Sequence, residues 1–120
     1  SAGTHIFQKG LPPDVRAQQV ALQRGINLSD LRTRKIRDKD FSTYDSILTM
    51  DNENYHILQQ LCPEEHMHKI SLVMEYAPEM GVSEVPDPYF SNIAGFERVF
   101  GMLEVAMHGV LEQLRYSEYQ

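Results

Sequence analysis

Apolar residues recur three and four positions apart in three stretches of this chain, a spacing typical of helices that bury one face. The first stretch covers residues 15–22, where Asp14 can cap the helix start and Gly25 ends the pattern. The second covers residues 52–61 and stops at Cys62-Pro63. A third, long C-terminal helix is predicted from the spacing of Phe96, Val99, Phe100, Leu103, Val110 and Leu114.

Two shorter stretches, residues 44–50 and 70–74, are largely apolar without helical spacing, and they predict buried strands. Helices that alternate with buried strands favour a parallel sheet covered on both faces. Residues 1–120 are therefore interpreted as a single α/β domain. In such sheets ligands bind in loops at the carboxyl ends of strands. Chemistry is expected in the loops after Thr4, Met50 and Met74.

The composition narrows the classes of partner. The chain has 120 residues, of which 42% are hydrophobic, enough for one globular core. No apolar run is long enough to cross a bilayer, so we expect no membrane span. The formal net charge of −6 argues against nucleic acid as a partner, because affinity for nucleic acid comes mainly from Lys and Arg. The single cysteine allows no internal disulfide and indicates a reducing, cytoplasmic location.

Candidate chemistry is sparse when each residue is considered alone. Asp87 lies between two prolines, which restrict the backbone and could hold a carboxyl group in place, although aspartate beside proline is also common in turns. Cys62 is not expected to be a nucleophile, because no arginine and no glycine-rich loop follows it. No pair of histidines has a metal-ligand spacing, and His66 with His68 alternates in a polar segment interpreted as a solvated loop. We therefore expect no metal site.

The stretch Glu84-Val85-Pro86-Asp87-Pro88-Tyr89-Phe90, followed by Gly95-Phe96-Glu97-Arg98-Val99, resembles the low molecular weight protein tyrosine phosphatases. Other segments match that family in the same order: Ser1-Ala2-Gly3-Thr4, Pro12-Pro13-Asp14, Gly25-Ile26-Asn27-Leu28-Ser29, Arg34-Lys35-Ile36 and the stretch from Tyr44 to Asp51. The resemblance covers essentially the whole chain. It implies a three-layer α/β sandwich with a small parallel sheet.

The resemblance also implies an activity and a set of site residues. Members of the family hydrolyse phosphotyrosine in proteins, or small aryl phosphates, through a cysteinyl-phosphate intermediate and without a cofactor. Asp87 matches the general acid, which protonates the tyrosine oxygen as it leaves phosphorus. Phe7 and Tyr89 match the aromatic walls that hold the phenyl ring, and Phe90 lies beside them.

Two departures from the family pattern limit what can be transferred. Leu31 stands where many relatives have a histidine that braces the phosphate loop. The Cys-x5-Arg phosphate loop, which relatives place with the first strand and helix before the segment matched by Ser1, does not occur in these 120 residues. We therefore expect the sequence to be N-terminally incomplete and inactive alone, and the full-length protein to be a phosphatase. A non-catalytic binding module of the same fold is the alternative; an arsenate reductase would need more cysteines.

Overall fold

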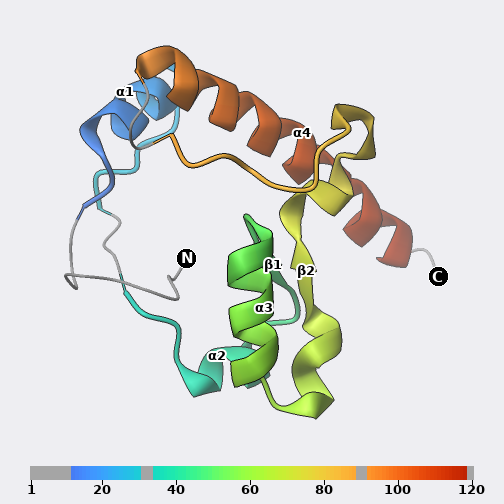
Figure 1. Cartoon of the computed structure of the whole chain (residues 1–120). Helices are drawn as coiled ribbons and strands as arrows, with labels where there is room; N and C mark the ends of the chain where they lie inside the picture. Colours follow the sequence, from blue (N-terminus) through green and yellow to red (C-terminus); the bar gives the residue numbers. More distant parts are fainter. Residues whose placement is uncertain (1–11, 31–33, 89–91, 119–120) are drawn as a thin grey trace.

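The structure is a computed structural model that describes residues 12–30, 34–88 and 92–118 (Figure 1). Helices and short strands follow one another along these ranges. The elements are α1 (Val15–Gln23), α2 (Asp38–Thr43), β1 (Ile47–Thr49), α3 (Asn52–Leu61), the 3-10 helix η1 (Glu64–Lys69), β2 (Ile70–Leu72), the 3-10 helices η2 (Val73–Tyr76) and η3 (Pro78–Met80), and α4 (Ile93–Glu118).

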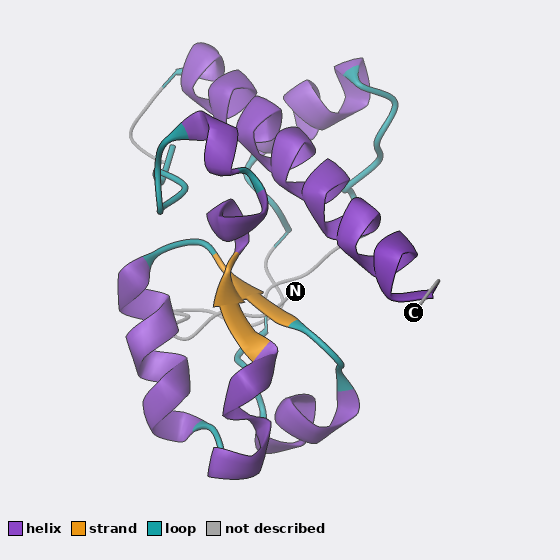
Figure 2. Cartoon of the chain, turned by 90° about the vertical axis from the view of Figure 1, so that its right-hand side faces the viewer, coloured by secondary structure: helices purple, strands orange, loops and turns teal. Residues whose placement is uncertain are grey.

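Strands β1 and β2 form a small parallel sheet, in which Ile47 pairs with Ile70 and Thr49 with Leu72. Helix α3 connects the two strands and contacts both of them (Figure 2). The hydroxyl of Thr49 also donates a hydrogen bond across the pair to the carbonyl oxygen of Ser71, at 3.0 Å. A parallel pair needs such a crossover, so the predicted α/β class is confirmed.

Aspartates begin two of the helices. The carboxylate of Asp14 accepts a hydrogen bond from the backbone N–H of Arg16 at 2.8 Å, and α1 follows directly, as the sequence predicts. Gly25 follows α1 with a φ of +80°, a conformation that glycine adopts without strain. The carboxylate of Asp51 caps α3 in the same way, by accepting from the N–H of Asn54 at 2.8 Å.

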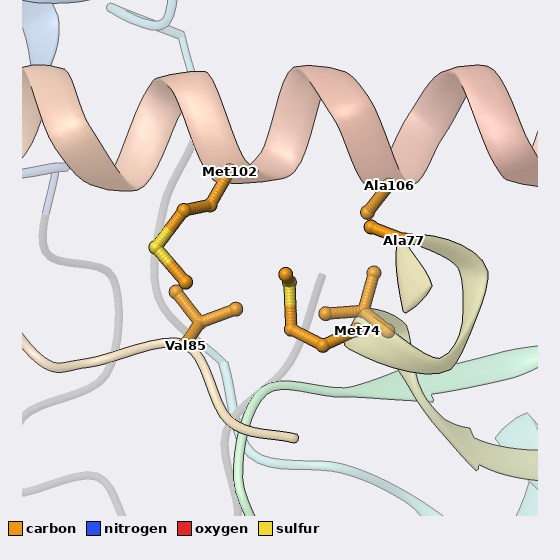
Figure 3. Packing of buried hydrophobic residues seen from close by; sticks show 6 residues of the cluster. Met74, Ala77, Val85, Met102 and Ala106 are labelled. Carbon is orange, nitrogen blue, oxygen red and sulfur yellow. The ribbon is translucent and has the colours of Figure 1, made fainter. Parts of the chain in front are cut away.

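The main hydrophobic core lies where α4 crosses η2 and the segment that follows η3. Figure 3 shows Met102 of α4 beside Val85, and Ala106 of α4 beside Ala77, with Met74 between them. A second cluster of buried residues lies near the start of β2 and packs α2 and α3 against it. Its members are Phe41, Leu58, Cys62 and Ile70. The first cluster fixes the segment that carries the candidate site.

Both strands are shorter than the sequence predicts. Residues 44–46 lie outside β1, since the backbone N–H of Tyr44 donates to the carbonyl oxygen of Asp40 and closes α2. Val73 and Met74 lie in η2 rather than in a strand. Both are 1% exposed, and a short apolar run of this kind fits a buried helical turn as well as a buried strand.

Two helical features also differ from the prediction. Helix α2 was not predicted, because its six residues contain one large apolar side chain, Phe41, and show no periodicity. In α4, Leu114 was expected to face the core but is 57% exposed, whereas Met102 and Ala106 are buried. The helix therefore packs through its first two thirds.

Candidate active site

The segment that carries Asp87 is attached to the carboxyl end of β1. The backbone N–H of Val85 donates a hydrogen bond of 2.7 Å to the carbonyl oxygen of Met50, the first residue after β1. The Val85 side chain is buried in the core against α4, as Figure 3 shows. One residue thus joins the loop to both the sheet and α4, at the edge where parallel sheets bind ligands.

Asp87 lies two residues beyond this attachment, and its side chain is exposed. Pro86 and Pro88 flank it, and each proline ring fixes its own φ near −65°. Each also restricts the residue before it, so the backbone of Asp87 is limited from the side of Pro88. An exposed carboxyl group at a restricted backbone position can donate or accept a proton at a defined place.

A second contact ties the same loop to α3. The side-chain amide of Asn52, the first residue of α3, donates to the carboxylate of Glu84 with an Nδ2 to Oε1 distance of 2.6 Å. The contact lies next to the Val85–Met50 hydrogen bond. Residues 84 and 85 are therefore bound to residues 52 and 50.

The other polar side chains at this edge of the sheet serve the fold. The carboxylate of Asp51 caps α3, and the hydroxyl of Thr49 donates a hydrogen bond to the carbonyl oxygen of Ser71. Thr49 is 4% exposed. These groups hold the β1–α3 junction together, whereas the exposed carboxyl group of Asp87 has no part in that junction's capping.

A model of the family described as low molecular weight phosphotyrosine protein phosphatase matches residues 1–119 of this chain. The chain belongs to this phosphatase family. Among individual relatives, a Synechocystis protein provisionally named a low molecular weight protein-tyrosine-phosphatase is 38% identical over 115 residues, which are 95% of this chain and 73% of the relative. The human low molecular weight phosphotyrosine protein phosphatase is 35% identical over 102 residues, covering 83% of this chain and 63% of the human protein.

Solved phosphatase structures share the fold. A protein tyrosine phosphatase from Entamoeba histolytica, crystallised with Hepes in its active site, is 33% identical and superposes with a TM-score of 0.91. The match covers 98% of this chain and 74% of that one. A low molecular weight phosphotyrosine phosphatase from Vibrio cholerae gives a TM-score of 0.87 at 29% identity. The fold class and the family predicted from the sequence are confirmed.

Of the site residues predicted by resemblance to the phosphatase family, only Asp87 lies within the described residues. Phe7, Tyr89 and Phe90 lie outside them, as does Leu31. The aromatic walls of the site therefore stay predictions.

Cys62 is a buried thiol in the second core cluster, 8% exposed. Burial raises the pKa of this thiol, and the nearby charge of Lys69 offsets only part of that effect. The thiolate is the reactive form of cysteine. The Cys62 thiol donates a hydrogen bond to the carbonyl oxygen of Pro63 at 3.3 Å. The environment is that of a structural cysteine rather than a phosphatase nucleophile.

His66 and His68 lie in η1, not in the loop that the sequence predicts. His66 is half-buried and lies 3.7 Å from the carboxylate of Glu65, whereas His68 is exposed. In the ranges described, no three His, Cys, Asp or Glu side chains gather as metal ligands would. No helix in those ranges combines the length and apolar character needed to cross a bilayer.

Arg34 and Arg37, two basic residues close together in the sequence, both contact Asp40. The Arg34 guanidinium donates to both carboxylate oxygens of Asp40, at 2.9 and 3.3 Å, and the N–H of Arg37 donates at 2.8 Å. These bonds, led by Arg34, lower the pKa of Asp40 to about 2. Asp40 is only 4% exposed, so its carboxylate is a buried charge that these arginine contacts compensate.

Proposed function

We propose that the full-length protein is a protein tyrosine phosphatase in which Asp87 is the general acid. One observation carries the assignment of the acid. The loop of Asp87 is fixed to the carboxyl end of β1 through Val85 and Met50, and it presents an exposed carboxyl group there. Membership of the phosphatase family supports the reaction class.

In the proposed first step, the cysteine of the family's Cys-x5-Arg loop attacks phosphorus, and the bond from phosphorus to the tyrosine oxygen breaks. Asp87 gives its proton to that oxygen, so tyrosine leaves as a neutral phenol. In the second step, water attacks the cysteinyl phosphate and Asp87 accepts a proton from it. The S–P bond breaks, which releases phosphate and restores the thiolate.

The nucleophilic cysteine and the phosphate-binding arginine are not among these 120 residues, whose single cysteine is the buried Cys62. We therefore propose that residues 1–120 alone hydrolyse no phosphate ester. Their contribution to the reaction is the acid loop and, by resemblance, the aromatic walls at Phe7, Tyr89 and Phe90.

The proposed substrates are phosphotyrosine-containing proteins or small aryl phosphates, because a deep aromatic cleft admits a phenyl ring that phosphoserine lacks. A related structure, Wzb of Vibrio vulnificus, was solved in complex with benzylphosphonate, which also carries a phenyl ring. That structure has 26% identity to this chain and a TM-score of 0.72. The free thiol of Cys62 supports the proposal of a cytoplasmic location.

The test is the substitution Asp87→Asn in the full-length protein. We expect kcat/KM for phosphotyrosine to fall by roughly 10²-fold, the usual scale for a positioned general acid. The value for an aryl phosphate with a strongly acidic phenol should fall much less, because that leaving group needs no proton. Asp45→Asn is the matched control, since Asp45 is also exposed but precedes β1 at the opposite end of the strand.

Equal losses for the two substrates would remove Asp87 from the acid role. No hydrolysis of either substrate by the unmodified full-length protein would favour the alternative, a non-catalytic binding module.

A further inference from the structure

We propose that Asn52 and Glu84 form a latch that positions Asp87 for proton transfer. The term latch refers to the hydrogen bond between these two side chains. The inference rests on the proposed function, since it concerns the loop of the general acid. It assigns to Asn52 and Glu84 a positioning role; neither is proposed to touch the substrate.

The two residues are 32 positions apart in sequence, yet the Asn52 Nδ2 to Glu84 Oε1 distance is 2.6 Å. The acceptor is a carboxylate, and hydrogen bonds to charged groups are shorter and stronger than those between neutral groups. The latch lies beside the bond from Val85 N–H to the Met50 carbonyl oxygen, at 2.7 Å. Two neighbouring loop residues are thus held by two residues of the β1–α3 junction.

These contacts matter for Asp87 because the part of its loop that precedes them is exposed. Gly81 has a φ of +70°, and residues 81–84 are exposed, with Val82 48% exposed. The loop becomes buried only at Val85. From there to Asp87 the chain passes through Pro86, whose φ is fixed. A shift of residues 84 and 85 therefore changes the point from which the chain reaches Asp87.

Catalysis is sensitive to such shifts, since a misplacement of about 1 Å can cost on the order of 10²-fold in rate. The Val85 anchor remains when the latch is removed, so we expect a smaller effect, about 3- to 10-fold, the size of one hydrogen bond. Stability should change little, because both side chains are at the surface and water can replace their partners.

The readout is the ratio of kcat/KM for phosphotyrosine to kcat/KM for p-nitrophenyl phosphate, measured with the full-length enzyme. The first substrate depends much more on the proton of Asp87 than the second, whose phenol is more acidic, so the ratio reports how well the acid is positioned. Asn52→Ala and Glu84→Ala should each lower the ratio about 3- to 10-fold, and the double variant should be no worse than either one. In an Asp87→Asn background, neither should change the ratio.

Two further variants separate the bond from its charge. Glu84→Gln removes the charge but keeps an oxygen that accepts from Asn52 in a weaker bond, so its ratio should lie between those of the unmodified enzyme and Glu84→Ala. Glu53→Ala removes an exposed carboxylate from the same turn of α3 without touching the latch, and it should leave the ratio unchanged.

The proposal is overturned if Asn52→Ala and Glu84→Ala leave the ratio unchanged while Asp87→Asn lowers it; the acid role of Asp87 would then stand without the latch. It is also overturned if Glu84→Gln behaves as Glu84→Ala, which would point to charge instead. If Asp87→Asn itself leaves the ratio unchanged, the proposed function fails first and the latch fails with it.

Discussion

Gly109 lies inside α4 at the point where this helix crosses η2. A Cβ atom built at this position would lie 2.9 Å from the carbonyl carbon of Tyr76 and closer still to its oxygen. The obstacle is backbone, which cannot move aside as a side-chain end can. Gly109→Ala should therefore push α4 away from η2, in the region of the main core.

Gly101 provides a matched control eight residues earlier in the same helix, because a Cβ there meets no atom within 4 Å. Alanine is preferred over glycine in a helix interior by about 1 kcal/mol, so Gly101→Ala should stabilise the protein by about that amount. At Gly109 the same gain is opposed by an overpacking cost of up to about 3 kcal/mol. The expected net loss there is about 2 kcal/mol, and the two variants should differ by about 3 kcal/mol.

Thermal unfolding of the full-length protein, followed by circular dichroism, measures this difference. A change of 1 kcal/mol shifts Tm by about 4 °C in a domain of this size. Gly101→Ala should therefore melt roughly 10 °C above Gly109→Ala. The reasoning on the close approach of α4 to η2 is refuted if Gly109→Ala is as stable as Gly101→Ala.

Two further predictions concern electrostatics and substrate choice. The pKa of Asp40 is lowered to about 2 from an ordinary 3.8, so its pairing stabilises the fold above pH 4 and is lost as the pH falls toward 2. Arg34→Ala should accordingly reduce resistance to urea more at pH 7 than near pH 2.5, where only part of the pairing remains; an equal loss at both would contradict this. Phe7→Ala or Tyr89→Ala should lower kcat/KM for aryl phosphates more than for small alkyl phosphates, because only aryl substrates lose the ring contact. Unchanged discrimination would mean that these aromatics only pack.

The helices predicted from the sequence are those with a capping residue at the start or a glycine or proline near the end. Helix α1 follows an aspartate cap and ends before a glycine with positive φ, and α3 ends at Leu61, two residues before Pro63. Such signals act within a few residues, so a sequence reveals them. The order of motifs around Asp87 was sufficient to identify the phosphatase family, which the family model confirms.

What the sequence did not reveal depends on contacts between distant residues. Val73 and Met74 lie in a helical turn that packs both side chains into the main core, which contains residues of α4. Asp40 lies among charged residues in the sequence, and nothing in that local pattern indicates that it is buried beside Arg34. The latch between Asn52 and Glu84 spans 32 residues and has no local signature.

The central claim is that the full-length protein removes phosphate from tyrosine. It is tested most directly by measuring the phosphate released from two peptides that differ only in carrying phosphotyrosine or phosphoserine. We expect rapid release from the phosphotyrosine peptide, hardly any from the phosphoserine peptide, and none from either when residues 1–120 are assayed alone. Equal release from both peptides, or no release from the phosphotyrosine peptide by the full-length protein, would contradict the claim.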